Sequence, residues 1–205
     1  MKLGLYGGTF DPVHFGHLLL AERCREELEL DEVRFIPAGD PPHKDRDDLS
    51  SGIARAEMLE FATAGNPRLV VDRRELKRPG RSFTVETLTE VRHEFPVAEL
   101  YFLMGADSLA DLPQWREPER ISQLARIVAV NRGDRPLPDV ATLNLTLGEA
   151  IASRVTFVSM PGIDLSSTEL RGRVAAGKGL RYTMPPAVEA YIRDRMLYQE
   201  VRSEK

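Results

Sequence analysis

Two histidines three positions apart, His14 and His17, stand just behind a pair of glycines, Gly7 and Gly8. Imidazole nitrogens can donate hydrogen bonds to phosphate oxygens, and residues three apart share one face of a helix. Consecutive glycines let the backbone turn sharply and approach a ligand closely, because no Cβ stands in the way. We therefore interpret this segment as a phosphate-binding bend in which backbone amides and two imidazoles contact a nucleotide.

The predicted elements around this bend suit the same chemistry. Residues 2–6 are expected to form a short buried strand, and a helical pattern begins near His14 with Leu20 and Cys24 on its apolar face. A strand, a glycine turn and a helix present backbone N–H groups and the positive end of a helix dipole to a phosphate. The alternative is an ordinary strand-to-helix turn with surface histidines, which two glycines alone would favour. The whole constrained run of residues 7–17 favours the phosphate site.

A zinc site is a poor explanation of the same histidines. The chain has four histidines and one cysteine, and Cys24 falls on the apolar face of the expected helix. A closed tetrahedral site would have to recruit distant carboxylates or His43.

Composition narrows the class of protein. With 205 residues, 42% of them hydrophobic and 29% charged, the chain has the make-up of one soluble globular domain. A net charge of −4 argues against broad binding to nucleic acid. No apolar stretch reaches the roughly 18 residues of a membrane span, and residues 2–6 leave no room for a signal peptide. A single cysteine fits a reducing cytoplasm, where we expect this protein as a monomer or homo-oligomer.

Apolar segments of strand length alternate along the chain with helical patterns. The expected strands are residues 3–6, 33–37, 68–72, 100–104, 126–130 and 155–159. The expected helices between them are residues 14–30, 53–64, 85–95 and 119–125. Nearly continuous apolar strands in such an alternation predict a Rossmann-like α/β fold, a doubly wound parallel sheet with helices on both faces. Ligands bind such sheets beyond the carboxyl ends of the strands.

The last part of the chain has helical patterns without further strands between them. Ser166 and Glu169 form a capping-box pattern that starts a helix, and Gly177 follows its expected end. Pro185 and Pro186 are expected to start a further helix that continues through Ala190, Ile192 and Leu197. We expect a single domain over residues 1–205, with a Rossmann-like core over about 1–160 and a small C-terminal helical appendage over about 161–198.

Several motifs together resemble one family. Residues 7–17 resemble the signature of the nucleotidylyltransferase superfamily, and the lead-in Gly-Gly-Thr-Phe-Asp-Pro is similar to its bacterial nicotinate mononucleotide adenylyltransferase branch. Further blocks match in order, and the resemblance covers residues 2–198. These blocks are Pro41-Pro42-His43-Lys44, Ser82-Phe83-Thr84, Gly105-Ala106-Asp107-Ser108-Leu109, Trp115 and Ser166-Ser167-Thr168-Glu169-Leu170-Arg171. Phe83 departs from the family, which often has a tyrosine there, so no hydroxyl can act at that position.

The resemblance implies an enzyme of NAD biosynthesis. It would transfer the adenylyl group of ATP to nicotinate mononucleotide and give nicotinate adenine dinucleotide and pyrophosphate. The alternative within the superfamily is adenylyl or cytidylyl transfer to another phosphorylated acceptor, such as nicotinamide mononucleotide, phosphopantetheine or glycerol phosphate. A non-catalytic nucleotide sensor would bind ATP without turnover, which the retained His14, His17 and Arg171 disfavour. An aminoacyl-tRNA synthetase is rejected because the chain is short and acidic.

The resemblance also assigns residues. The expected catalytic residues are His17, His14, Lys44 and Arg171. The expected ATP-binding residues are Gly8, Thr9, His14, His17, Gly105, Asp107, Arg132, Ser167, Thr168 and Arg171. His17 is expected to stabilise the transition state, and Asp107 to accept a hydrogen bond from a ribose hydroxyl. On sequence alone, Asp107 could equally be a helix cap for residues 108–112.

The resemblance also implies which residues bind the acceptor. The expected binding residues are Lys44, Phe83, Thr84, Val85, Asp107 and Trp115. The face of Trp115 suits a cationic pyridinium ring, although a tryptophan can equally anchor its loop in the core. Thr84 is expected to cap a helix whose N-terminus would favour the nicotinate carboxylate over a neutral amide.

The expected reaction needs little acid–base chemistry. A phosphate monoester has a second pKa near ~6 and is mostly dianionic at neutral pH, so the nucleophile is already deprotonated. Catalysis then rests on positioning and on neutralising the leaving pyrophosphate. Mg²⁺ is expected as the cofactor, carried by the ATP phosphates rather than by protein ligands.

Overall fold

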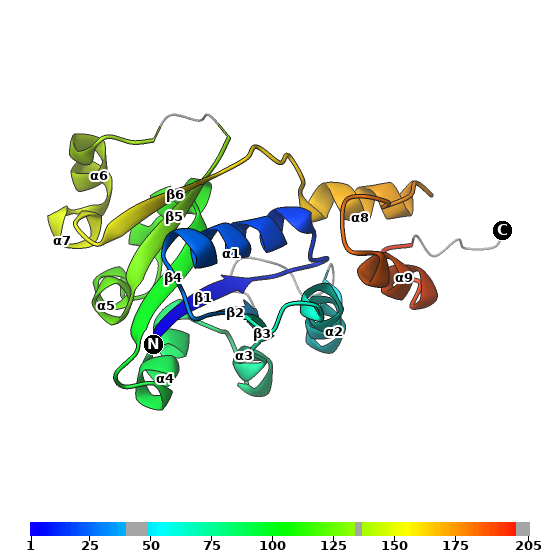
Figure 1. Cartoon of the computed structure of the whole chain (residues 1–205), viewed down its shortest axis with the longest axis horizontal. Helices are drawn as coiled ribbons and strands as arrows, with labels where there is room; N and C mark the ends of the chain where they lie inside the picture. The colour runs from blue at the N-terminus through cyan, green and yellow to red at the C-terminus, as the bar shows by residue number, and fades with distance from the viewer. Residues whose placement is uncertain (40–48, 134–136, 200–205) are drawn as a thin grey trace.

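A single six-stranded sheet, with all strands parallel, organises the chain (Figure 1). The computed structural model describes residues 1–39, 49–133 and 137–199. The strands are β1 (Lys2–Gly8), β2 (Glu32–Pro37), β3 (Leu69–Val71), β4 (Glu99–Gly105), β5 (Arg126–Arg132) and β6 (Val155–Met160). Their order in the sheet is β3-β2-β1-β4-β5-β6. All six predicted strands and the doubly wound fold are confirmed.

Helices connect the strands and cover both faces of the sheet. They are α1 (Phe15–Glu27), α2 (Gly52–Thr63), α3 (Arg74–Lys77), α4 (Thr84–Glu94), the 3₁₀ helix η2 (Ala106–Gln114), α5 (Pro118–Leu124), α6 (Val140–Leu147), α7 (Glu149–Ala152), α8 (Ser167–Ala175) and α9 (Pro186–Asp194). The predicted helices are all present, but α3, α6 and α7 were not predicted. In helix α6, weak helix formers such as threonine alternate with strong ones such as leucine. It is stabilised by the Asp139 side chain, which accepts a hydrogen bond from the Thr142 N–H, and by burial of Leu143 and Leu147.

Two hydrophobic cores lie on opposite faces of the sheet, because successive side chains of a strand point to opposite sides. Leu3 and Leu5 belong to one core, with apolar residues of α4, α5 and α6. Tyr6 and Leu103 belong to the other, with apolar residues of α1, α2, α8 and α9. The predicted apolar face of α1 is confirmed there by Cys24, whose thiol pKa is raised to about 12 by burial and by the nearby charge of Glu27.

The order of the strands reverses direction at β1. Pairing of β1 with β4 ends at Tyr6 and Leu103, whereas pairing with β2 continues to Gly8 and Pro37. A crevice can therefore open between β1 and β4 at their carboxyl ends, which is where open α/β sheets bind ligands. Separately, among residues 1–39, 49–133 and 137–199, every helix falls short of the length and apolar character needed to cross a bilayer.

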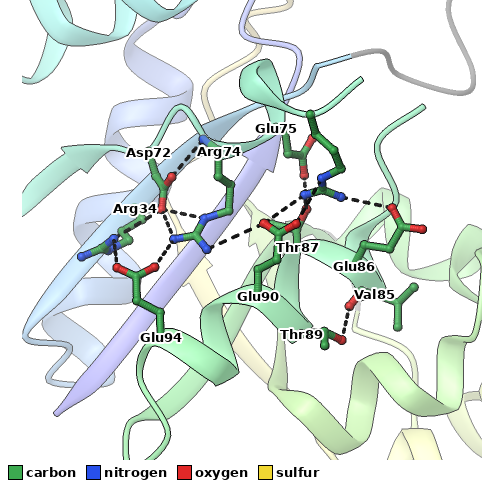
Figure 2. A network of polar contacts seen from close by, with 11 residues as sticks. Arg34, Asp72, Arg74, Glu75, Val85, Glu86, Thr87, Thr89, Glu90 and Glu94 are labelled. Atoms are coloured by element: carbon green, nitrogen blue, oxygen red, sulfur yellow. Dashed lines mark hydrogen bonds and ion pairs between the residues drawn. The ribbon is translucent and has the colours of Figure 1, made fainter. Parts of the chain in front are cut away.

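A network of ion pairs fixes α4 against the edge of the sheet (Figure 2). The carboxylate of Asp72, just after β3, accepts hydrogen bonds from Arg74 Nη2 at 2.6 Å and from Arg34 Nη1 at 3.3 Å. Arg74 also binds Glu94, near the end of α4, at 2.8 Å. These contacts join β2, the end of β3, α3 and α4 at one point.

A second set of contacts fixes the first half of α4. Thr87 donates its hydroxyl hydrogen to Glu75 at 2.6 Å and accepts a hydrogen bond from Arg78 at 2.9 Å (Figure 2). Arg78 also pairs with Glu86 at 3.1 Å. The N-terminus of α4 is thus held in place beside the carboxyl ends of the strands.

Asp72 gives this network a testable pH dependence. Burial opposes ionisation of Asp72, but the hydrogen bonds and charge of Arg74, together with Arg34, outweigh it and hold its pKa below the ordinary value. A lowered pKa in the folded state contributes stability that is fully present above the unfolded pKa and is lost as pH falls through the folded value.

We expect Asp72→Asn to lower the free energy of unfolding at pH 7 by about 1.5–3 kcal/mol, the range for hydrogen bonds to charged groups. The difference from the unsubstituted protein should shrink below about pH 4. Urea unfolding at several pH values measures this. Asp194→Asn, which removes an exposed pair with the adjacent Arg193, is the control and should change stability little. A deficit of equal size at pH 7 and pH 3 would contradict the prediction.

Candidate active site

The bend after β1 differs from the prediction in where the chain turns. Gly7 and Gly8 are the last residues of β1, and the left-handed residue that turns the chain is Phe10, with φ of 51°. A Cβ on Gly8 would lie 2.9 Å from Cζ of Phe10, whose ring is buried. Gly8 is therefore needed for this close packing rather than for the turn. The expected close approach to a ligand is still open to both glycines.

The two histidines lie together at the start of α1, as predicted. His14 is the N-cap residue, and its backbone N–H donates to Nδ1 of His17 at 3.3 Å. Nδ1 of His17 is thus an acceptor, so the neutral ring carries its proton on Nε2, the nitrogen that can donate to a phosphate. The two rings stack with centroids 3.7 Å apart. A Cβ on Gly16 would lie 3.0 Å from the His14 ring, which explains the glycine between the histidines.

Helix α8 brings its first turn to the same bend. The Ser167 hydroxyl donates to the Pro12 carbonyl at 2.9 Å, and Arg171 Nη1 donates to the Asp11 carbonyl at 2.7 Å. Arg171 also reaches Thr168 Oγ1 at 3.4 Å. The N-termini of α1 and α8 therefore flank one short backbone segment, as Figure 1 shows. The predicted N-cap is confirmed as well, because Ser166 Oγ accepts from the Glu169 N–H.

Some of the backbone N–H groups at the start of α1, which were expected to bind phosphate, already donate to backbone carbonyls. The Phe15 N–H donates to the Thr183 carbonyl at 3.0 Å, and the His17 N–H donates to the His14 carbonyl at 2.9 Å. Any phosphate contact at this helix therefore depends mainly on the imidazole side chains and on the dipole.

A cavity of about 550 Å³ opens on the other side of the glycines, at the crevice between β1 and β4. It runs from the bend to the N-terminus of α4 and to the end of η2. Its lining residues are Gly7, Gly8, Thr9, Ala38, Glu75, Ser82, Phe83, Thr84, Phe102, Gln114, Trp115, Arg116 and Ile121. The structure thus places predicted ATP-binding and predicted acceptor-binding residues around one space.

Aromatic side chains form the far end of this cavity. Trp115 is partly buried and packs edge-on against Phe102, with ring centroids 6.0 Å apart. It therefore packs on the core, as one of the two alternatives expected, and also lines the cavity, while its contact with a pyridinium ring stays a prediction. The guanidinium of Arg116 stacks on the Phe83 ring at 4.7 Å and pairs with Glu86 at 2.9 Å.

The predicted cap at Thr84 is wrong by one residue. The N-cap of α4 is Phe83, and Thr84 is the first residue of the helix, so its hydroxyl is not in the capping position. Val85 is buried in the core, which leaves only its backbone for a ligand. The Glu86 N–H already donates to the Phe83 carbonyl at 3.1 Å, which leaves the N–H groups of Thr84 and Val85 without a partner inside the helix, as at any helix start.

The remaining predicted residues are not gathered at the cavity. Asp107 is exposed in the first turn of η2 and is absent from the cavity lining. The alternative that Asp107 caps this helix is wrong, because the N-cap is Gly105 at the end of β4. Arg132 ends β5, and its side chain lies outside what the structure describes. Lys44 lies outside the described residues altogether.

Sequence reasoning missed several residues around this site. Glu75 and Arg116 line the cavity, and burial raises the pKa of Glu75 despite its hydrogen bond from Thr87. Arg55 is 2% exposed and binds backbone carbonyls at the bend. One signal for Arg55 was available, since it shares the apolar face of α2 with Met58 three residues on.

The fold and the bend together define a class of protein. The parallel sheet has a crevice at its switch point, and two helix N-termini face the bend that follows β1. This arrangement is typical of an α/β nucleotide-binding protein.

Comparison with known proteins identifies the family within that class. Residues 5–173 match the cytidylyltransferase-like family. A probable nicotinate-nucleotide adenylyltransferase of Thermomicrobium roseum is 44% identical over 98% of this chain and 94% of its own length. Another, of Thermus thermophilus, is 44% identical over 97% of this chain and all of its own. The chain belongs to the cytidylyltransferase-like family and is a nucleotidyltransferase.

Solved structures agree on the fold. The Plasmodium falciparum nicotinic acid mononucleotide adenylyltransferase complexed with NaAD superimposes with a TM-score of 0.78 at 18% identity, covering 96% of this chain and 97% of that one. A putative Vibrio parahaemolyticus nicotinate-nucleotide adenylyltransferase gives a TM-score of 0.67 at 19% identity, covering 98% and 97%.

Enzymes of this class generally use a divalent metal ion together with the nucleotide. Within the described part of the chain, no group of three or more His, Cys, Asp or Glu side chains is arranged to hold such an ion. The carboxylate of Asp11, which lies at the bend, is already bound by the Ser50 N–H and the Tyr198 hydroxyl.

The packing of Gly8 yields a matched pair of substitutions. We expect Gly8→Ala to destabilise the fold by about 1–3 kcal/mol, the cost of overpacking, because the new methyl group meets the buried Phe10 ring. Gly172→Ala in α8 adds a methyl group in open space and should stabilise by about 0.5–1 kcal/mol. Thermal or urea unfolding of both variants measures this. Equal stability of the two variants would contradict the packing role of Gly8.

Proposed function

We propose that this protein transfers the adenylyl group of ATP to nicotinate mononucleotide and forms nicotinate adenine dinucleotide and pyrophosphate. Relatives that are 44% identical over nearly the whole chain carry the name nicotinate-nucleotide adenylyltransferase. The structural observation that carries the proposal is the cavity joining Gly8 and Thr9 to Phe83, Thr84 and Trp115. It offers one continuous space to a nucleotide phosphate and to a flat aromatic acceptor.

The proposed reaction is an in-line displacement at the α-phosphorus of ATP. A phosphate oxygen of the mononucleotide forms the new P–O bond, and the bond to the departing pyrophosphate breaks. At neutral pH the attacking phosphate is already dianionic, so no general base is needed. The protein has to hold two anions in line and to stabilise charge on the leaving group.

Residues at the bend suit the ATP side of this reaction. The neutral ring of His17 carries its donor hydrogen on Nε2, because Nδ1 accepts from the His14 backbone. This donor gains strength as negative charge builds on the phosphates. Ser167, Thr168 and Arg171 lie in the first two turns of a second helix at the same bend, and we propose that they bind the outer phosphates. Ser167 would do so through its backbone N–H, because its hydroxyl hydrogen is donated to the Pro12 carbonyl. Arg171 keeps further N–H donors beyond those it gives to Asp11 and Thr168.

The other end of the cavity suits the acceptor. A pyridinium ring is a flat cation, which the partly buried face of Trp115 can bind by cation–π attraction. The N-terminus of α4 at Phe83 and Thr84 offers backbone N–H groups and the positive end of a dipole to the carboxylate. Lys44 remains a proposed contact of the acceptor phosphate.

We propose Mg²⁺ as the metal ion, held by phosphate oxygens and water. This assignment fits the Asp11 carboxylate, both of whose oxygens are bound by protein donors. The ion would neutralise charge on the triphosphate. The protein side chains then have the separate task of orienting the phosphates.

The choice of acceptor is the direct test of the proposed function. With ATP and Mg²⁺, we expect pyrophosphate release with nicotinate mononucleotide, and a kcat/KM about 2- to 30-fold higher than with nicotinamide mononucleotide, as a helix N-terminus predicts. Phosphopantetheine and glycerol phosphate serve as negative controls. Equal kcat/KM for the two pyridine mononucleotides would contradict the role of the α4 N-terminus, and turnover with phosphopantetheine alone would overturn the proposal.

His17 is the residue on which the mechanism depends most. We expect His17→Ala to lower kcat by about 100- to 1,000-fold, the usual loss for a donor to transition-state charge. Binding of nicotinate mononucleotide, measured by calorimetry, should stay within about threefold, because the proposed acceptor contacts lie elsewhere. His93→Ala, at an exposed position near the end of α4, is the control. Near-normal turnover of His17→Ala would remove this residue from the mechanism.

A further inference from the structure

A buried arginine lies directly beneath the glycine bend. The side chain of Arg55 on α2 is almost completely buried, and it donates to three backbone carbonyls. Its Nη1 binds the Thr9 carbonyl at 2.8 Å, its Nη2 the Ala38 carbonyl at 2.7 Å and its Nε the Ser50 carbonyl at 3.1 Å. These carbonyls follow β1, follow β2 and precede α2, so one guanidinium joins three separate segments at the carboxyl end of the sheet.

The fully buried carboxylate of Asp11 extends this cluster. One carboxylate oxygen accepts from the Ser50 N–H at 3.1 Å, and the other accepts from the hydroxyl of Tyr198. Tyr198 follows α9, 187 residues further along the chain, and its hydroxyl also lies 3.9 Å from the sulfur of Met58. The carbonyl of Asp11 is the group that Arg171 binds.

The charges in this cluster depend on one another. Burial lowers the pKa of Arg55, while the charge of Asp11 opposes that shift. Burial and the Asp11 charge raise the pKa of Tyr198, so its hydroxyl stays a neutral donor at physiological pH. A buried charge is tolerated only when its hydrogen bonds are made, and a satisfied network of this kind is rigid. The planar fork of arginine suits three carbonyls in a way that a lysine ammonium does not.

We propose that Arg55 and Tyr198 are positioning residues for the reaction, because together they hold Thr9 and Asp11 in place within the phosphate-binding bend. This inference rests on the proposed adenylyl transfer. Neither side chain needs to touch substrate. Arg55 sets where the Thr9 carbonyl lies, and Tyr198 orients Asp11, whose carbonyl Arg171 binds. The end of the chain thereby contributes to a site that begins at its first strand.

The chain offers a matched control for Tyr198. Tyr191 on α9 also donates its hydroxyl hydrogen to a carboxylate, that of Glu57 on α2. Both tyrosines therefore connect the C-terminal part of the chain to the core. The hydroxyl of Tyr198 binds the bend, whereas the hydroxyl of Tyr191 binds α2. Replacing either by phenylalanine removes one hydroxyl and keeps the ring.

The experiment compares Tyr198→Phe and Tyr191→Phe in the full chain, at a temperature where both are folded. We expect Tyr198→Phe to weaken binding of a non-hydrolysable ATP analogue and to lower kcat/KM for ATP by about tenfold, the effect of losing one hydrogen bond to a charged group. Tyr191→Phe should stay within about twofold of the unsubstituted protein in both measurements. Melting temperatures of the two variants should fall by similar amounts, which separates positioning from stability.

The outcomes separate this inference from the proposed function. If the unsubstituted protein binds the ATP analogue but does not turn over with nicotinate mononucleotide, the proposed function fails, and the binding data still decide on Tyr198. If Tyr198→Phe and Tyr191→Phe bind the analogue equally well, the positioning role is overturned.

Arg55 is tested by graded substitution. We expect Arg55→Lys to keep part of the ATP-analogue affinity and Arg55→Met to lose most of it, because only lysine retains a donor for a carbonyl. Equal affinity of the lysine and methionine variants, when both are folded by circular dichroism, contradicts the role of the guanidinium. If either Arg55 variant fails to fold, the comparison of Tyr198→Phe with Tyr191→Phe tests the proposal by itself.

Discussion

The site depends on close packing of a short backbone segment between β1 and α1. A Cβ on Gly8 would lie 2.9 Å from the Phe10 ring and a Cβ on Gly16 would lie 3.0 Å from the His14 ring, so a methyl group at either position would have to displace a side chain. The stacked histidines and the turn at Phe10 lie next to these two contacts. Hydrogen bonds from α2 and α8 then hold the same segment from two further directions. Rigidity of this kind favours catalysis that works by positioning and electrostatics.

The sheet determines where this segment can act. Because β1 pairs longer with β2 than with β4, its last residues border a crevice that only a few segments can reach. The N-terminus of α4 and the end of η2 enter from the other side, and the ion pairs around Arg74 and Arg78 keep α4 in place (Figure 2). Two substrates can thus meet at the switch point of the sheet.

Much of this arrangement could be predicted from the sequence, and the features that could not be predicted have physical reasons. The strands were predictable because buried parallel strands are almost continuously apolar. Helix α6 was not, because weak and strong helix formers alternate in it, and the Asp139 cap and the packing that stabilise it are visible only in the folded chain. The turn at Phe10 was misplaced, since glycine marks both turns and close packing and sequence cannot separate these uses. The contact of Tyr198 with Asp11 could not be found, because nothing local reports a partner 187 residues away.

The central claim is that the triphosphate of ATP binds at the bend between β1 and α1, where His17 and the start of α8 face it. A crystal structure with a non-hydrolysable ATP analogue and Mg²⁺ tests this most directly. The account predicts phosphate oxygens within hydrogen-bond distance of His17 Nε2 and of the Thr168 and Arg171 side chains. A triphosphate bound elsewhere, with the bend occupied by water alone, would contradict it.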